Sequence, residues 1–215
     1  MSILDENTKT NDAVEGLVDS SSDELEKEKT LIGKARQGDQ LSFKALVEKY
    51  KSQVASLAYR MVGDYEDAKD ISQNVFIKTY QNLNSFDTER RFSTWLYRIT
   101  MNASIDFLRK YKKHKMDNLD NLVGQLASAK DNTEKVFNDT LIKWAVESTL
   151  DKLNRKQKSV FVLRDLEGLD IKEISQITQM PQATVRWYLH RARVKLKGEL
   201  IKNHPSILKR IGVKV

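Results

Sequence analysis

Residues that break helices are scarce in this chain, whose 215 residues include only 2 Pro and 8 Gly. Apolar residues recur at spacings of three and four, and no strand-like alternation is sustained anywhere. One unbroken run contains Phe43, Leu46, Val47, Tyr50, Val54, Leu57, Ala58 and Met61. This spacing places apolar side chains along one face of a helix, and so few breakers favour long helices over a many-turned β architecture. The sequence therefore predicts an all-α fold.

Changes in composition divide the predicted helices into two lobes. In the first lobe, Gly38 and Gly63 are expected to end helices, because Gly is favoured just past a helix end. Asp39 is expected to open the helix between them. After a fourth helix, predicted from about Ser93 to Arg109, the chain turns polar and weakly periodic. The predicted order is an acidic, disordered tail at 1–22, a first lobe at 23–111, a flexible linker at 112–132, a second lobe at 133–203 and a basic tail at 204–215.

Charge is distributed unevenly along the chain. The net charge is +7, yet residues 1–26 contain eight acids and one base, which gives that segment −7 and leaves +14 on the rest. A strongly basic body suggests a polyanionic partner such as nucleic acid. The alternative from charge alone is a solvated basic surface.

Several classes of function lack the residues they need. The absence of Cys excludes thiolate zinc sites, thiol nucleophiles and disulfides. Glu66 and Asp70 share a helix face, but no further ligand is in register, so no metal site is expected. With three scattered His and no glycine-rich phosphate loop, no catalytic constellation is found, and neither enzymatic activity nor a cofactor is expected.

Membrane insertion and export are not indicated either. No segment approaches the roughly 18 consecutive apolar residues that a membrane span needs. The N-terminus has neither the basic start nor the apolar run of a signal peptide. We therefore expect a cytoplasmic protein with no direct membrane insertion.

The second lobe contains a predicted helix-turn-helix. Asp170 with Glu173 forms a capping pattern for a short helix, and Pro181 is suited to the first turn of the next one. That longer helix has an inward stripe of Val185, Leu189, Ala192 and Leu196. Its outer face holds Gln182, Ala183, Thr184, Arg186, Trp187, His190, Arg191 and Arg193. A short helix, a tight turn and a basic helix are typical of major-groove recognition, although an ordinary helical hairpin with a solvated basic face would show the same pattern.

The side chains on this outer face suit DNA in different ways. Arg186 could read a guanine edge and Gln182 an adenine edge, each through two hydrogen bonds. The remaining cations would neutralise phosphates, which positions a protein without reading sequence. His190 has no second ligand nearby at metal-binding spacing.

Aromatic and basic residues alternate near the fourth helix of the first lobe. Trp95, Arg98, Asn102 and Arg109 align along that helix at spacings of 3, 4 and 7, and Arg90 and Arg91 precede it. Rings that stack on unpaired bases beside cations that follow the backbone suit single-stranded DNA. A core position for Trp95 is the alternative, and the pattern leaves both open.

These segments resemble a known family. Gly38-Asp-Gln-Leu-Ser-Phe43, Asp67-Ala-Lys-Asp-Ile-Ser-Gln-Asn-Val-Phe76 and Phe92-Ser-Thr-Trp-Leu-Tyr-Arg-Ile99, with Asn102, Asp106 and Arg109, resemble the first conserved block of bacterial sigma-70 family sigma factors. The similarity is to the compact extracytoplasmic-function (ECF) group. Residues 153–200 resemble that group's second block. The order of the blocks, with a linker between them, is highly specific.

The resemblance implies a transcription initiation factor that binds core RNA polymerase and opens promoters. Docking on the clamp coiled coil of the largest subunit is implied for Asp67, Asp70, Ile71, Gln73, Asn74, Phe76 and Lys78. Recognition of the −10 element, with a base of the opened non-template strand flipped into a pocket, is implied for Asn84, Asp87, Arg90, Arg91, Trp95, Arg98, Asn102 and Arg109. The outer face of the basic helix, from Gln182 to Arg193, is expected to read the −35 element as duplex DNA. The polymerase flap and an anti-sigma factor are further implied partners.

Some positions depart from the family pattern. Lys69 and Asn74 stand where glutamates are usual, which changes the charge of the docking face. Gln179 replaces the usual Gly of the turn, at a cost of about 1 kcal/mol if its backbone is left-handed. The alternative function is a free-standing helix-turn-helix regulator, which would bind duplex promoter DNA tightly without polymerase.

Overall fold

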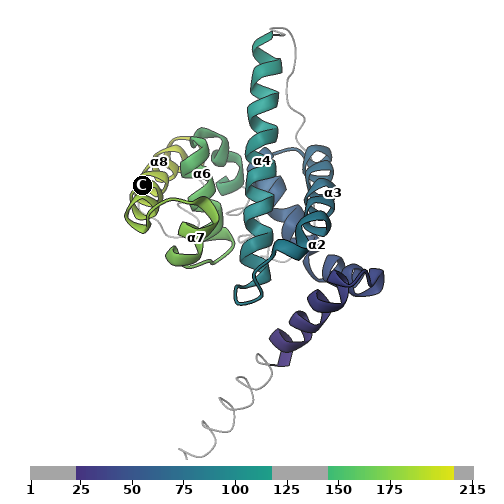
Figure 1. Ribbon diagram of the computed structural model, residues 1–215. Helices are drawn as coiled ribbons and strands as arrows, with labels where there is room; N and C mark the ends of the chain where they lie inside the picture. The colour runs from purple at the N-terminus through teal and green to yellow at the C-terminus, as the bar shows by residue number, and fades with distance from the viewer. Residues whose placement is uncertain (1–22, 118–144, 206–215) are drawn as a thin grey trace, which may run out of the picture.

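The computed structural model describes residues 23–117 and 145–205, with side chains at 23–110 and 145–205 (Figure 1). Within these two ranges the regular structure is helical throughout and contains no strand, which confirms the all-α prediction. The predicted tail at 1–22, the helix expected to start near residue 133 and most of the linker and basic tail lie outside the described residues.

The first lobe consists of a helix at 23–36 and three longer helices. These are α2 (Gln40–Val62), α3 (Tyr65–Asn82) and α4 (Phe92–Asp117), with a short 3-10 turn, η1 (Leu83–Ser85), between α3 and α4. Helices α2, α3 and α4 pack against one another around one core. That core includes Leu46, Val54, Ala58, Ile71, Val75, Leu83, Phe92 and Leu96.

The ends of α2 follow the predicted signals. The Asp39 side chain accepts hydrogen bonds from the backbone N–H of Leu41 at 3.0 Å and from Ser42 Oγ at 2.6 Å. These bonds, chiefly the one from Ser42, lower the pKa of the Asp39 carboxyl. Gly63 ends the helix with φ 84°, a left-handed conformation that glycine adopts without steric cost. Both predicted boundaries are confirmed.

Helix α4 is longer than predicted. It continues to Asp117, whereas the sequence pattern indicated an end near Arg109 and a linker from residue 112. The segment 110–117 contains neither Gly nor Pro to stop the helix. The first residues assigned to the linker are therefore helical.

The second lobe is built from shorter elements. After a helical segment at 145–149 come η2 (Leu150–Lys152), α6 (Arg155–Phe161), a π-helical turn η3 (Val162–Leu166), α7 (Ile171–Thr178) and α8 (Gln182–Asn203). Two capping boxes are complete: Asn154 with Gln157 at the start of α6, and Asp170 with Glu173 at the start of α7. Each satisfies two backbone N–H groups that a helix start would otherwise leave unpaired.

The predicted helix-turn-helix is present as α7, a tight turn and α8. The stripe of Val185, Leu189, Ala192 and Leu196 is buried, as its spacing indicated. Ser175 Oγ donates a hydrogen bond to the Met180 carbonyl oxygen at 2.6 Å, which ties the turn back to α7. Pro181 is the residue that precedes the first turn of α8 rather than a member of it.

Gln179, which stands where the family usually has Gly, has a left-handed backbone with φ 56° and ψ 30°. It is the one non-glycine residue with positive φ among those described. The turn has therefore kept its shape, and the glutamine carries the strain in its backbone.

Replacing Gln179 by Gly should raise the free energy of unfolding by about 0.5–1 kcal/mol, because glycine removes the left-handed strain. Thermal or urea denaturation would measure this gain. Gln176→Gly, at an exposed position inside α7, is the matched control and should instead cost about 1 kcal/mol. A loss of stability in both variants would contradict the strained-turn interpretation.

Candidate nucleic-acid interface

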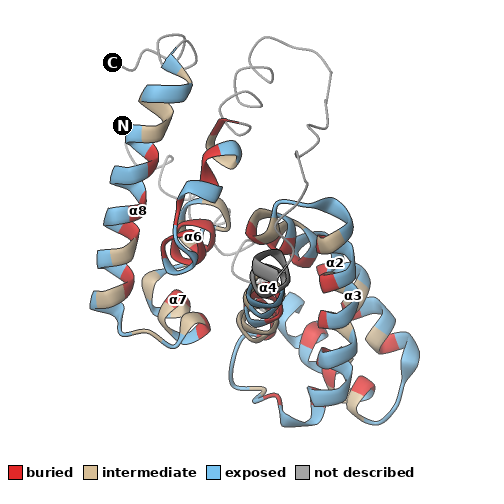
Figure 2. Ribbon diagram, turned by 90° about the horizontal axis from the view of Figure 1, so that it is seen from above, coloured by how far each residue is buried: buried red, intermediate tan, exposed pale blue. Residues whose placement is uncertain are grey.

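Helix α4 lies between the two lobes and has three distinct faces (Figure 2). Leu96 and Ala103 are buried in the first-lobe core. Tyr97 and Met101 are buried in a second cluster that consists mostly of second-lobe residues. A third face contains the predicted DNA residues Trp95, Arg98, Asn102 and Arg109, of which Asn102 and Arg109 are exposed and Trp95 and Arg98 half-buried. The structure thus brings this predicted stripe together on one face of α4, with Trp95 also packed against the first-lobe core.

Trp95 belongs to an aromatic cluster at the start of α4. Its ring centroid lies 5.1 Å from that of Phe86 and 5.7 Å from that of Phe92, and Phe86 and Phe92 meet edge to face at 5.3 Å. Phe86 and Phe92 are buried, whereas Trp95 is only half-buried. The Trp95 ring therefore packs against the first-lobe core and is still partly exposed, and its stacking on an unpaired base stays a prediction.

The loop before α4 is polar and exposed. Asn84, Asp87, Arg90 and Arg91 are all exposed, as a strand-binding loop requires. Asp87 accepts a hydrogen bond from the backbone N–H of Glu89 at 3.1 Å and pairs with Arg90 at 3.1 Å. These contacts lie within the loop and leave its polar side chains exposed to solvent.

A hollow of about 360 Å³ lies between this loop and the helix at 23–36. Phe86, Phe92, Thr88 and Arg90 line it from the loop side, and Ile32 lines it from the helix. Its charged lining is mixed, with Lys29, Arg90 and Arg91 beside Glu26, Glu28 and Glu89. The rings of Phe86 and Phe92 are the apolar surface that an unstacked base needs.

The outer surface of α3 contains the predicted polymerase-docking residues. Asp70, Gln73, Asn74 and Lys78 are exposed, and Asp67 is half-buried. Burial, followed by the neighbouring carboxylates of Asp64 and Asp70, raises the pKa of Asp67. Ile71, by contrast, is buried in the first-lobe core, so its side chain supports the helix from behind.

Phe76 lies at the edge of an open groove of about 600 Å³ between α2 and α3. Tyr59 and Tyr65, which the sequence patterns did not single out, also line this groove and are exposed. An apolar groove rimmed by exposed rings is typical of a surface that contacts another macromolecule.

Helix α8 presents most of its predicted DNA-binding residues to solvent. Gln182, Ala183, Arg186, Trp187, His190 and Arg191 are exposed, and Thr184 is half-buried. Arg186 donates a hydrogen bond to Gln182 Oε1 at 3.4 Å, and the Arg191 guanidinium lies 5.1 Å from the Trp187 ring centre. Both pairs join residues four positions apart on the exposed face of α8.

Arg193 differs from the rest of that set. Its guanidinium makes two hydrogen bonds to the Asp165 carboxylate of η3, with 3.0 Å from Nε. The same contact raises the pKa of Arg193. This side chain is therefore engaged within the lobe, and a phosphate would have to compete with Asp165 for it.

Neither a membrane span nor a metal cluster was found in the described ranges. No helix at 23–117 or 145–205 is both long and apolar enough to cross a membrane. In the same ranges, no three His, Asp or Glu side chains gather in a way that could hold a metal ion.

Comparison with known proteins decides the family. The family model for Sigma-70 region 2 matches residues 46–114, and that for Sigma-70 region 4 matches residues 143–196. The ECF RNA polymerase sigma factor SigW of Bacillus subtilis is 35% identical over 181 residues, which cover 80% of this chain and 96% of SigW. The chain belongs to the ECF sigma factors.

Two further comparisons agree with this assignment. The ECF RNA polymerase sigma-E factor of Escherichia coli K12 is 32% identical over 180 residues, covering 80% of this chain and 94% of that protein. The structure of CnrH in complex with the cytosolic domain of CnrY has a TM-score of 0.62 at 25% identity, covering 82% of this chain and 99% of CnrH. The sigma factor therefore directs promoter-specific transcription, as the sequence motifs indicated.

The two lobes of the sigma factor are in direct contact, which the sequence did not reveal. Helix α7 packs against α4, and Tyr97, Met101, Leu57 and Met61 of the first lobe share one apolar cluster with the second-lobe core (Figure 1). Periodicity identified Leu57 and Met61 as part of an apolar helix face, but it could not show that this face also contacts another lobe.

A polar cluster lies within this contact. Glu167, just after η3, accepts hydrogen bonds from Arg60 of α2 and from the Tyr97 hydroxyl at 3.4 Å. The Arg60 side chain is 14% exposed and that of Glu167 only 9%, so the pair is largely removed from water. Burial, together with the Glu167 carboxylate, raises the pKa of Tyr97 to about 12. Its hydroxyl therefore stays protonated as a donor at neutral pH.

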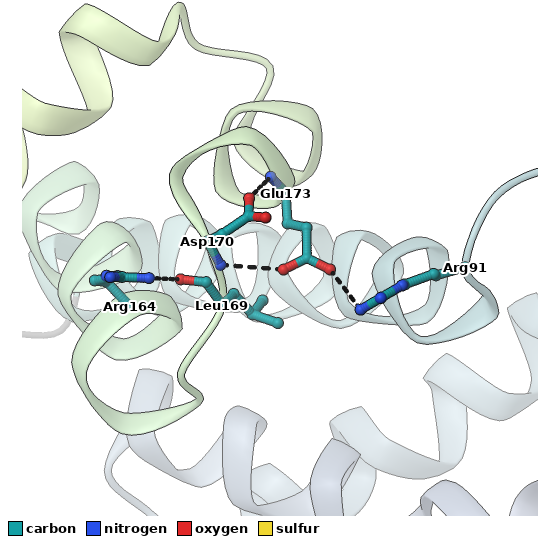
Figure 3. Close-up of polar contacts among 5 residues, drawn as sticks. All are labelled: Arg91, Arg164, Leu169, Asp170 and Glu173. Carbon is teal, nitrogen blue, oxygen red and sulfur yellow. Dashed lines mark hydrogen bonds and ion pairs between the residues drawn. The ribbon is translucent and has the colours of Figure 1, made fainter. Parts of the chain in front are cut away.

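A second ion pair crosses the contact near the loop that is predicted to bind DNA. Arg91 lies 3.3 Å from Glu173, the residue that also completes the capping box of α7 with Asp170 (Figure 3). Behind it, Arg164 donates to the Leu169 carbonyl oxygen at 2.8 Å and braces the approach to α7. One predicted −10 residue is thus paired with the helix-turn-helix in this arrangement.

Replacing Glu167 by Gln should weaken the contact between the lobes by about 2–3 kcal/mol, because the largely buried guanidinium of Arg60 then keeps only the longer pair with Glu147, at 3.9 Å. A fluorescent donor and acceptor, one on each lobe, would report a longer mean distance. Lys51→Gln breaks the exposed pair with Glu48 and should change this distance little, since exposed pairs contribute about 1 kcal/mol or less. An unchanged distance in the Glu167 variant would show that the polar cluster does not hold the lobes together.

Proposed function

We propose that the exposed side of α3 docks the sigma factor on the clamp coiled coil of the polymerase largest subunit. Asp70, Gln73, Asn74 and Lys78 supply polar contacts there, and Phe76 contributes from the edge of the groove between α2 and α3. The support is the exposure of the four polar residues on α3. Gln73 and Phe76 line the apolar groove toward α2, whereas Asp70, Asn74 and Lys78 line a second hollow toward α4. Asp67 and Ile71 act from within the helix, the first through its charge and the second by packing.

The loop 84–91 and the third face of α4 bind the opened non-template strand of the −10 element. Trp95 stacks on an unpaired base, while Arg98 and Arg109 follow the phosphates and Asn102 contacts a base edge. The hollow beside the loop receives a flipped base, whose unstacking costs a few kcal/mol. Support comes from the exposed stripe beside an aromatic cluster.

Helix α8 reads the −35 element in duplex DNA, and the second lobe also contacts the polymerase flap. Arg186 and Gln182 reach base edges in the major groove, and His190 and Arg191 contact the backbone. Trp187 adds an apolar contact with a thymine methyl group or a sugar. The observation that supports this role is their joint exposure on the outer face of α8.

Binding of both elements requires the lobes to separate. The −10 and −35 elements are nearly two helical turns apart, on the order of 60 Å, whereas α7 packs directly on α4. The closed arrangement is therefore the form away from the promoter. CnrH is similar to this chain and is bound by the cytosolic domain of CnrY in its structure, and an anti-sigma factor is the corresponding partner proposed here.

The sigma factor acts in the cytoplasm, where polymerase and promoters are found, and has no catalytic activity of its own. The observation that carries the proposed function is the match of the chain to both sigma regions, together with the exposed basic face of α8. Run-off transcription with core polymerase on genomic fragments tests it, and new start sites are expected only when the protein is added. Tight, specific binding to duplex promoter by the protein alone would instead favour a free-standing regulator.

Arg186→Ala should cost roughly 1–3 kcal/mol in promoter binding and relax specificity at one base pair of the −35 element, because a bidentate base contact is lost. Binding measured against a set of single-base promoter variants would show this. Lys195 is an exposed cation further along α8, and Lys195→Ala should weaken binding to all promoter variants equally. Equal loss on every promoter for Arg186→Ala would assign it to phosphate contact.

Asp70→Lys should weaken binding to core polymerase at least about tenfold, because it reverses a charge on the proposed docking face. Competition for core enzyme against the unaltered sigma factor would measure the change, and thermal melting would show that the lobe still folds. Glu48→Lys makes the same reversal at an exposed site on α2 and should bind normally. Equal affinity for the two variants would remove α3 from the polymerase interface.

A further inference from the structure

The helix at 23–36 lies outside both regions that the family models match, the first of which begins at residue 46. It is nevertheless held firmly against the first lobe. Glu28 is buried, and its carboxylate accepts hydrogen bonds from the Tyr50 hydroxyl and from Lys49 Nζ at 2.7 Å. Ile32 and Ala35 of the same helix are buried in the lobe core. A buried carboxylate with two donors fixes both the rotation and the position of this helix.

The same helix also holds the loop that leads to α4. Arg36 Nε donates a hydrogen bond to the Leu83 carbonyl oxygen at 3.1 Å, and a second guanidinium nitrogen donates to the carbonyl oxygen of Phe86. These two carbonyl groups lie at the start and just beyond the end of η1. Two charge-assisted hydrogen bonds from one planar group therefore set where the loop leaves the lobe.

The two attachments converge on the hollow of about 360 Å³ beside the loop. The Tyr50 ring, which Glu28 holds, lies 5.5 Å from the ring of Phe92 in the floor of the hollow. Glu28 and Ile32 line the hollow from the helix, and Phe86, whose carbonyl Arg36 binds, lines it from the loop. The wall and the floor are thus fixed by side chains of one helix.

We propose that the helix at 23–36 forms the fixed wall of the pocket for the flipped non-template base, and that Glu28 and Arg36 are its positioning residues. This inference rests on the proposed binding of the opened strand by the loop 84–91. Because the pocket is already formed, the complex does not have to pay the entropy of ordering the loop when the base is unstacked. The helix therefore contributes to promoter opening without reading the duplex.

The test uses the full-length sigma factor with core polymerase, on a promoter located by run-off transcription. Replacing non-template bases one at a time by abasic sites identifies the flipped position as the one whose loss lowers open-complex formation, by about tenfold if the pocket binds the base. Arg36→Gln removes the guanidinium bonds to the loop. Lys34→Gln, the matched control, removes one exposed charge from the same helix.

With Arg36→Gln, open-complex formation on the intact promoter should fall about tenfold, to the level that the wild type reaches on the abasic promoter. Open-complex formation on the abasic promoter should not fall further. A purely structural defect would not be selective for the base in this way. Lys34→Gln should behave as the wild type on both promoters. If thermal melting shows that Arg36→Gln unfolds the lobe at the assay temperature, Arg36→Lys, which keeps the charge but loses the two-pronged contact, provides the same comparison.

Equal losses on the intact and abasic promoters would overturn the positioning role, and so would wild-type behaviour of both Arg36 variants. Failure of the proposed function gives a different result. In that case the wild-type protein itself would initiate at no promoter, or no single base removal would affect opening.

Discussion

Helix α4 has to meet three different neighbours along one segment of chain. Leu96 and Ala103 face the core of the first lobe, Tyr97 and Met101 face the second lobe, and Asn102 remains at the surface. Because residues on one helix face recur every three or four positions, these roles alternate between adjacent residues. The rotation of α4 about its axis is therefore the constraint on which the lobe contact and the candidate strand-binding surface both depend.

Ion pairs link the two lobes. Carboxylates of the second lobe hold arginines of the first, with Glu167 on Arg60 and Glu173 on Arg91. The Arg91 side chain is 72% exposed, so this pair is weak and screened by salt. In the proposed open state the same arginine is released toward phosphate, whose binding gains from the displacement of counterions.

Sequence reasoning succeeded where the structure is determined by bonds between near neighbours. Asp39, Gly63 and Asp170 were identifiable because capping and left-handed turns depend on residues within four positions. The end of α4 was missed because nothing in Tyr111 to Asp117 either stops or requires a helix. Local patterns thus gave the elements, with errors where no strong signal exists.

The candidate sites were predictable only as far as helix faces are. The exposed stripe of α4 and the outer face of α8 follow from spacing alone, and their roles in binding stay predictions. The partners of Arg60 and Arg193 lie 107 and 28 positions away in the sequence, which no spacing rule connects. Large separation in sequence also hid the contact between the lobes. The Tyr97 ring gave no further clue, because a tyrosine suits an exposed stacking surface as well as a buried interface.

The extra length of α4 has a mechanical consequence. The C-terminal end of α4 stands clear of the other helices in Figure 1, and the seven residues after Lys110 extend the helix by roughly 10 Å at 1.5 Å per residue. The chain toward the second lobe is therefore attached to the tip of a stiff lever and not to the body of the first lobe. A small tilt of this helix is therefore magnified at its tip, where the chain continues toward the second lobe.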